Sequence, residues 1–393
     1  ESRLCEPLDC PTFQRGRVAA MGCRHGRSGE YGDEAAARGA AAGSSPKVAA
    51  GTPARLRVPA DDVLPWAIGI GGGRLAVSGV EGMVYVYDAG RSRLAGSFQA
   101  HKKTVNRLLP LGNHRLLTAS ADATIRLWHT GVNGTPVGAE NSDSDPEPTL
   151  CLQGHKMSVS ALDLLSQGDS GDASDGDVLF TGSRDCTVRL WDLAAGKELQ
   201  QHKILRNVVT AVRRVPGQVS AVVQASEDLQ LRLWDARAGL SPQHAVRAGP
   251  NQLICLDASN DGAYVACGSK GFSRENCEVK VFDLRTGLRQ LSAAMCADQT
   301  IEALRMVGPD RCLIAGKDGY IRSVALPEVR VLQERGPAAA GYTALGVELR
   351  SNGIPVALAA SAGPSGPGLE LLTWPDATLA TAPALLASTG GGH

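Results

Sequence analysis

An arginine, an aspartate and a cysteine stand together at Arg184, Asp185 and Cys186, within the stretch TGSRDCTVRLWD of residues 181–192. A carboxylate, a thiol and a guanidinium could form part of an active site, as a base, a nucleophile and an anion-binding group. The residues that follow alternate with a period of two, which predicts a strand preceded by a turn. Whether the cluster does chemistry depends on whether it recurs in the chain.

The same pattern does recur, as a turn acid, two alternating apolar positions and a closing tryptophan. Strong copies are TASADATIRLWH (118–129) and QASEDLQLRLWD (224–235), and weaker ones are VSGVEGMVYVYD (77–88), SRENCEVKVFD (273–283) and AGKDGYIRSV (315–324). A catalytic group has no reason to appear six times, whereas the blades of a β-propeller repeat every ~40 to 45 residues and often end in Trp-Asp. Asp185 is therefore predicted to be structural.

We predict an all-β fold, a seven-bladed β-propeller over residues 53–375, between a disordered arm (1–52) and a loose tail (376–393). The arm is rich in Arg, Gly, Ala and Ser and has no strand periodicity. Polar inserts at 131–149 and 166–177 lack apolar anchors and are expected to be solvated loops. The expected blades cover residues 61–98, 99–130, 151–194, 203–237, 250–286, 298–326 and 341–374.

The seventh of these units contains only three strand candidates. The extended stretch ARLRVPA (54–60), ahead of the first blade, could supply the missing outer strand. Joining the first and last blades in this way removes the free sheet edges that an open ring would expose.

Composition excludes several classes of function. The formal net charge is zero, so no global basic field favours a nucleic acid. Ten cysteines without paired spacing suggest reduced thiols in a cytosolic compartment. No apolar run approaches the roughly 18 residues of a membrane span, and no secretory signal is expected. We expect no cofactor, because GIGGGR (69–74) ends in Arg74 where a dinucleotide motif requires glycine.

The repeats resemble the WD-repeat family over roughly 320 residues. In that family a histidine near the start of the blade, a hydroxyl residue, the turn aspartate and the tryptophan form a buried hydrogen-bonded chain. The resemblance implies two complete tetrads, formed by His101, Thr118, Asp122 and Trp128 and by His155, Thr181, Asp185 and Trp191. A satisfied buried network of this kind specifies one packing.

Other motifs support weaker readings. The basic residues that precede the aromatic landmarks could suggest a nucleic-acid site, but they fit side chains that lie along neighbouring strands; they are Arg126, Arg189, Arg232 and Lys280. No GxSxG elbow accompanies the histidines, so no catalytic triad is predicted. The stretch GDSGDASDGD (168–177) misses the register of a calcium loop, and we expect no metal. Ser142 and Ser144 resemble acidophilic kinase sites, although a solvating linker is the default.

The middle blades further resemble a ciliary group within the WD-repeat family. The residues responsible are RNVVTAV (206–212), ASEDLQLRLWDAR (225–237) and SKGFSRENCEVKVFDLR (269–285), in which the blade turn is expanded around Gly271 and Phe272. This resemblance implies a role in cilia or flagella, assisting the recruitment of intraflagellar transport particles and the Bardet-Biedl coat.

The predicted function is that of a non-catalytic scaffold that binds other proteins. The family resemblance implies that the residue before each turn acid lies on the partner-binding face; these residues are Val80, Ala121, Arg184, Glu227 and Lys317. The set mixes apolar residues and both charges, which suits a protein partner better than a phosphate polymer. Two alternatives stay open: a structural component of the axoneme, and a substrate receptor of a ubiquitin ligase. An enzyme is not expected.

The N-terminal arm contains one further candidate site in MGCRHGRS, which starts at Met21. If translation began there, Gly22 would be a myristoylation site and Cys23 a palmitoylation site, with basic residues after them. Two such signals suffice for stable membrane anchoring. A disordered arm with a chance Met-Gly-Cys is the equally weighted alternative.

Overall fold

The computed structural model describes residues 54–56, 63–112, 114–131, 134–136, 146–165, 177–204, 207–237, 239–338, 340–349, 355–363 and 366–374. The chain divides into two units, 1–44 and 45–393, and every described residue belongs to the second. The predicted acylation sites Gly22 and Cys23 therefore lie outside the described residues, as do the predicted arm and most of the two polar inserts. No described helix has the length and apolar character needed to cross a membrane.

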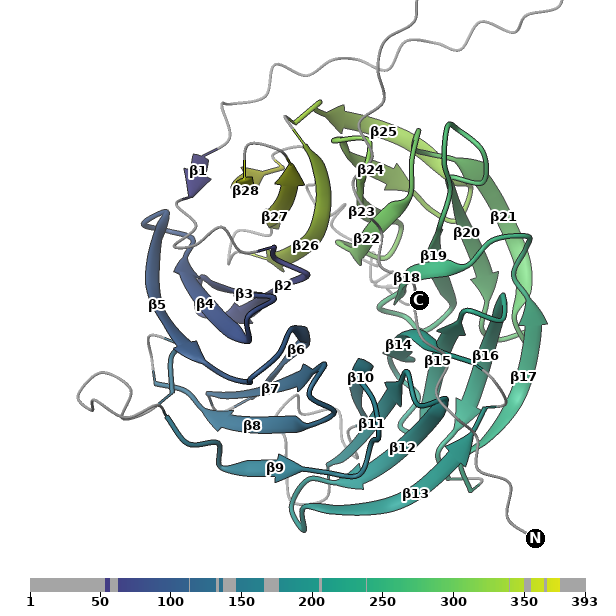
Figure 1. Ribbon diagram of the computed structural model, residues 1–393. Coiled ribbons are helices and arrows are strands. Elements are labelled where there is room, and N and C mark those ends of the chain that lie inside the picture. The colour runs from purple at the N-terminus through teal and green to yellow at the C-terminus, as the bar shows by residue number, and fades with distance from the viewer. Residues whose placement is uncertain are drawn as a thin grey trace, which may run out of the picture. The chain divides into compact units, whose positions relative to one another are not determined.

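The second unit is an all-β, seven-bladed propeller, as the repeats predict. Seven four-stranded antiparallel sheets are arranged around a central axis, and in each of them neighbouring strands pair in a simple meander (Figure 1). The innermost strands are β2, β6, β10, β14, β18, β22 and β26, and we call them the inner strands.

Blades one to four contain β2 (Trp66–Gly71), β3 (Arg74–Ser78), β4 (Met83–Asp88) and β5 (Arg93–Gln99); β6 (Val105–Leu111), β7 (Arg115–Ser120), β8 (Ile125–His129) and β9 (Leu150–Leu152); β10 (Val159–Leu165), β11 (Val178–Ser183), β12 (Thr187–Asp192) and β13 (Lys197–Lys203); and β14 (Val209–Arg214), β15 (Ala221–Ser226), β16 (Gln230–Asp235) and β17 (Ser241–Arg247). Blades five to seven contain β18 (Leu253–Ala258), β19 (Tyr264–Ser269), β20 (Glu278–Asp283) and β21 (Arg289–Met295); β22 (Ile301–Met306), β23 (Arg311–Gly316), β24 (Ile321–Ala325) and β25 (Arg330–Arg335); and β26 (Gly341–Leu349), β27 (Pro355–Gly363) and β28 (Gly366–Thr373), with β1 (Ala54–Leu56) as the fourth strand of blade seven.

Strand β1 closes the ring. It pairs antiparallel with β28, with Ala54 opposite Leu371 and Leu56 opposite Leu369, so the earliest described strand completes the last blade. This confirms the predicted closure for residues 54–56. With β1 in place, every blade has four strands and packs between two neighbouring blades, so the ring is closed.

Several predicted blade boundaries were wrong, because the outermost strands escaped notice. The ranges 203–237, 250–286 and 298–326 stopped short of β17, β21 and β25, and β9 belongs to blade two rather than to the predicted blade three (151–194). The cause is exposure. In β13, for example, every residue except His202 is exposed, so no buried face imposes an apolar pattern. The insert at 131–149 consequently lies within blade two and not between two blades.

The central strands of each blade are buried on both faces. All six residues of β15 and of β19 are buried, and so are Thr187 to Trp191 of β12. The alternation seen in the sequence therefore does not separate a core face from a solvent face. Instead, each face packs against a neighbouring blade, as in a sheet covered on both sides.

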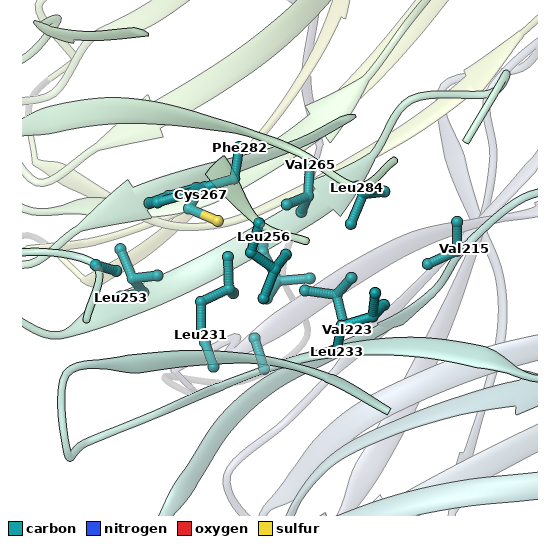
Figure 2. Close-up of a cluster of buried hydrophobic side chains, with 14 of the residues drawn as sticks. Val215, Val223, Leu231, Leu233, Leu253, Leu256, Val265, Cys267, Phe282 and Leu284 are labelled. Atoms are coloured by element: carbon teal, nitrogen blue, oxygen red, sulfur yellow. The ribbon is translucent and has the colours of Figure 1, made fainter. Parts of the chain in front are cut away.

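The core consists of clusters between consecutive blades. Figure 2 shows the cluster between blades four and five, where Val223 and Leu233 lie against Leu256 and Val265. Burial of apolar area at about 25 cal/mol per Å² makes these contacts the main stabilisation of the ring. Equivalent clusters join every other pair of neighbouring blades in the described residues.

Four residues of the predicted solvated inserts are instead buried, namely Gly134, Thr135, Pro136 and Asp177. Thr135, in the insert at 131–149, is only 4% exposed and contacts Gly96 of blade one, and Gly134 approaches Ile70 and Val86. Asp177, at the end of the second insert, is 3% exposed. The prediction of solvent exposure relied on polar character alone. It was wrong here because a small threonine or glycine fits closely against a neighbouring sheet.

Candidate functional site

The predicted tetrad of blade three is assembled by the hairpin of β11 and β12 and by the segment before β10. His155 Nε2 lies 2.9 Å from Thr181 Oγ1, and Trp191 Nε1 donates to the same hydroxyl at 2.9 Å. His155 Nδ1 lies 3.0 Å from Asp185 Oδ2. An ionised carboxylate only accepts hydrogen bonds, so Nδ1 donates to it. The four side chains thus form one chain of hydrogen bonds from the indole to the carboxylate.

Blade two repeats this geometry. His101 Nε2 lies 2.7 Å from Thr118 Oγ1, Trp128 Nε1 donates to that hydroxyl at 3.0 Å, and His101 Nδ1 lies 2.9 Å from Asp122 Oδ2. The side chains of both histidines are almost fully buried. A substrate could reach neither imidazole without opening a blade, so the geometry suits structure rather than catalysis.

A fifth residue completes each tetrad and was missed in the sequence. Thr187 donates to Asp185 Oδ1 through its hydroxyl at 2.6 Å and its backbone N–H at 2.9 Å, and Thr124 binds Asp122 in the same way. The signal was present, since a threonine stands two residues after the turn acid in both blades. Burial by itself raises the pKa of each aspartate, but the hydrogen bonds from histidine and threonine outweigh it and hold the pKa below its usual value.

The three residues that first suggested chemistry do not converge. Asp185 is enclosed by its hydrogen bonds, Arg184 is exposed, and Cys186 occupies the left-handed position of the turn with φ 64°. Ala123 and Leu229 take the same conformation in the neighbouring blades. The thiol is therefore a turn residue placed where the tight turn requires a positive φ.

Blade four replaces the tetrad with another network. Trp234 Nε1 donates to Gln224 Oε1 at 3.0 Å, and Gln224 in turn donates to Ser226. Asp228 forms an ion pair with Arg232. Glutamine thus accepts the hydrogen bond of the indole in place of threonine, and the buried polar atoms remain hydrogen-bonded.

The basic residues before the aromatic landmarks do not form a positively charged ring. Arg189 pairs with Glu198 at 2.5 Å, Lys280 pairs with Glu278 at 3.1 Å, and Arg232 pairs with Asp228. Arg126 donates to the carbonyl of Ala100 at 2.8 Å. These cations are used within their own blades, so nothing in their arrangement favours a nucleic-acid backbone.

The predicted partner-binding residues lie at one rim of the propeller. Backbone N–H groups of Ala121, Arg184, Glu227 and Lys317 each donate to a carbonyl just before an inner strand begins, at 2.8 to 3.0 Å. Lys270 makes the same bond to Gln252 in blade five and was missed, because the expanded turn hid its register. We call these residues, with Val80 on the corresponding turn of blade one, the turn rim.

The turn rim is uneven in exposure and charge. Val80, Arg184, Glu227, Lys270 and Lys317 are exposed, whereas the predicted candidate Ala121 is half-buried. Lys317 pairs with Glu302 at 3.0 Å. No ion pair links Arg184, Glu227 or Lys270 to another described residue, so these three charges remain available to a partner.

Two large apolar side chains accompany these charges. Phe272 is 73% exposed, beside Lys270, in a short hairpin that an Arg274–Asp298 ion pair at 2.7 Å secures. Met157 is 51% exposed and adjoins Ser158, whose carbonyl binds the backbone of Arg184. Neither was predicted as a site residue. Within the described part of the chain, no group of three metal-ligating side chains gathers.

Comparison with known proteins agrees with this geometry. Residues 92–129 and 146–192 match the family model described as WD domain, G-beta repeat. In these two stretches the chain is similar to WD40 repeats, and its seven blades and buried tetrads fit a WD40-repeat β-propeller. Proteins of this class are typically non-catalytic and bind other proteins.

Individual relatives are similar at low identity. WD repeat-containing protein 81 of Danio rerio is 33% identical over 49% of this chain and 9% of its own length. The CCR4-associated factor 4 homolog of Candida glabrata and mitochondrial division protein 1 of Neurospora crassa are each 26% identical over 42% of this chain, covering 29% and 31% of those proteins. The chain therefore matches less than a third of the length of each of these relatives.

Proposed function

We propose that this propeller is a rigid docking platform whose turn rim binds a protein partner. The observation that carries the proposal is that two exposed apolar side chains and three charges without an ion-pair partner occur together on these turns. The apolar residues are Phe272 and Met157, and the charged ones are Arg184, Glu227 and Lys270. Aromatic residues, methionine and arginine are enriched in protein interfaces. The buried tetrad of blade three fixes the turn that carries Arg184, so this part of the surface is preorganised and loses little entropy on binding.

Reversing the two unpaired charges of neighbouring blades, Arg184→Glu with Glu227→Arg, should weaken capture of the partner at least about tenfold. The net charge does not change, and substitutions of exposed residues shift the free energy of unfolding by about 0.5 kcal/mol at most. Affinity purification from a cell lysate, quantified by mass spectrometry, measures the capture, and thermal melting measures the fold.

A matched control reverses two exposed charges that lie away from the turn rim, Arg289→Glu with Asp310→Arg. We expect this variant to retain its partners. If the turn-rim variant captures the same proteins in the same amounts as the control, Arg184 and Glu227 do not belong to the interface.

We further propose that the platform works in cilia or flagella and assists recruitment of intraflagellar transport particles and the Bardet-Biedl coat. The proposal rests on the resemblance of SKGFSRENCEVKVFDLR (269–285) to a ciliary group within the WD-repeat family. That stretch includes Lys270 and Phe272 of the proposed docking surface. Acylation at Gly22 and Cys23 would add a membrane tether to this role.

Salt extraction of isolated cilia tests the ciliary proposal. A trafficking adaptor should leave with the membrane and matrix fraction. Immunoblotting of each fraction for the chain measures this. Retention in the salt-washed axoneme would favour a structural axonemal component instead, and absence of the chain from both fractions would refute a ciliary role.

A further inference from the structure

A cavity of about 480 Å³ lies along the axis of the propeller. The register of the inner strands gives its position. These strands begin next to the turn rim, and the cavity is lined along their length, from Trp66 and Glu302 near their starts to Leu111, Leu164 and Arg214 near their ends. Its volume falls in the range of small-molecule sites, about 300 to 1,000 Å³.

Charged side chains from four consecutive inner strands line this cavity at one register position. Asp163, Arg213, Asp257 and Arg305 are each the fifth residue of their strand. Arg213 Nε donates to Asp257 Oδ1 at 2.6 Å, and its Nη1 lies 3.6 Å from Asp163 Oδ2. One arginine thus bridges two carboxylates.

Backbone groups satisfy the same carboxylates further. Asp257 accepts hydrogen bonds from the N–H groups of Met306 and Ala258, and Asp163 accepts from those of Arg214 and Leu164. Both carboxylates are therefore held in place by neighbouring blades as well as by Arg213. They are not free to swing towards the remaining cations of the cavity.

Arg305, unlike Arg213, bridges no carboxylates and instead stacks on an indole. Its guanidinium carbon lies 4.2 Å from the ring centroid of Trp66, and that of Arg107 lies 4.1 Å from the same centroid. Within the described residues, no carboxylate forms an ion pair with either arginine. Two like charges thus share one aromatic ring.

The electrostatic environment makes this arrangement costly without a counter-ion. Burial, and then the positive charge of Arg305, lowers the pKa of Arg107. Burial also lowers the pKa of Arg305, and Asp257 offsets that only in part. The remaining acid of the lining, Glu302, pairs with Lys317 on the turn rim. The cavity therefore retains an excess of positive charge.

Donor groups are also left over. Arg107 donates to the carbonyls of Asn106 and Thr210, and Arg305 donates to that of Leu304. A guanidinium has five N–H donors, so most of those on Arg305 and several on Arg107 make no hydrogen bond to another described residue. Planar guanidinium groups bind oxyanions in a bidentate manner, and such contacts strengthen where water is excluded.

We propose that this axial cavity binds a small phosphate-bearing anion with at least two negative charges, held by Arg107 and Arg305 on either side of Trp66. Two cations that lack acid partners require two charges for neutrality, and the tetrahedral oxygens of a phosphoryl group offer acceptors to both. None of the three residues named for this site belongs to the turn rim.

Inorganic pyrophosphate is the probe for this site. Isothermal titration at constant ionic strength should give a Kd below about 1 mM, and the double variant Arg107→Gln with Arg305→Gln should weaken binding at least about tenfold, the effect of losing charged hydrogen bonds. The matched control, Arg184→Gln with Lys270→Gln, removes the same charge from the turn rim and should bind pyrophosphate like the wild type.

Circular dichroism and thermal melting establish that each variant folds. If the double variant does not, Arg107→Lys keeps the charge but loses the planar fork, and should bind several-fold more weakly than the wild type. Three results would overturn the proposal: no heat of binding beyond that of a chloride control, equal affinity of the folded double variant, or citrate binding as tightly as pyrophosphate.

Discussion

Replacing Trp191 with alanine should lower the free energy of unfolding by about 3 to 5 kcal/mol, the usual cost of truncating a buried aromatic side chain. The indole is 2% exposed and packs among apolar residues between blades two and three. Truncation would leave a cavity there and would also remove the hydrogen bond to Thr181. Urea denaturation followed by circular dichroism measures the change.

Leu199→Ala is a suitable control, because Leu199 is 51% exposed on an outer strand and its loss should cost less than about 0.5 kcal/mol. Equal denaturation midpoints for the two variants would contradict the structural role assigned to the tetrad tryptophan.

Replacing Asp185 with alanine should destabilise the fold by about 1 to 3 kcal/mol, because the donors of a buried network lose their acceptor. The carboxylate accepts from His155, from the backbone of Lys156 and from Thr187. Glu227→Ala, in the turn of the next blade, removes an exposed carboxylate and should be nearly neutral. Thermal melting compares the two variants. An unchanged melting temperature for Asp185→Ala would show that the hydrogen bonds to this carboxylate contribute nothing to the stability of the fold.

The destabilisation caused by Asp185→Ala should become smaller at low pH. The pKa of Asp185 is lowered in the folded state, so its contribution is fully present above the unfolded value of about 3.9 and disappears as the pH falls through the folded pKa. The stability difference between wild type and Asp185→Ala should therefore narrow from pH 5 downwards. A difference that stays constant to pH 2 would mean that the fold does not lower the pKa of this carboxyl group.

The repeating part of this fold could be predicted because its determinants lie close together in sequence. Each tetrad spans one blade, so the acid, the hydroxyl residue and the tryptophan of blade three fall within residues 181–191. The seven-bladed ring and its closure by residues 54–56 followed from this repetition and from one missing strand. Local signals failed at the outer strands, where exposure leaves no apolar pattern to detect.

The axial cavity could not be predicted, because its residues meet only through the register of separate blades. Trp66 contacts Arg107 from the next blade and Arg305 from the sixth, and nothing near Trp66 in sequence announces either arginine. Lys270 was missed for a different reason, since an expanded turn displaced the acid that would have marked it. Local patterns thus locate blades, whereas properties shared by all blades emerge only in three dimensions.

The pairing of β1 with β28 also constrains how the chain reaches its native state. Ala54 meets Leu371, so this sheet cannot be completed until the residues of β28, up to Thr373, have left the ribosome. Contacts of such high sequence separation raise the contact order and slow the final step of folding, because loop-closure entropy is lost before the contact is gained. During synthesis, the earlier blades can form from local hairpins while β1 still lacks its partner strand. A chaperone would be most useful to this protein in that interval.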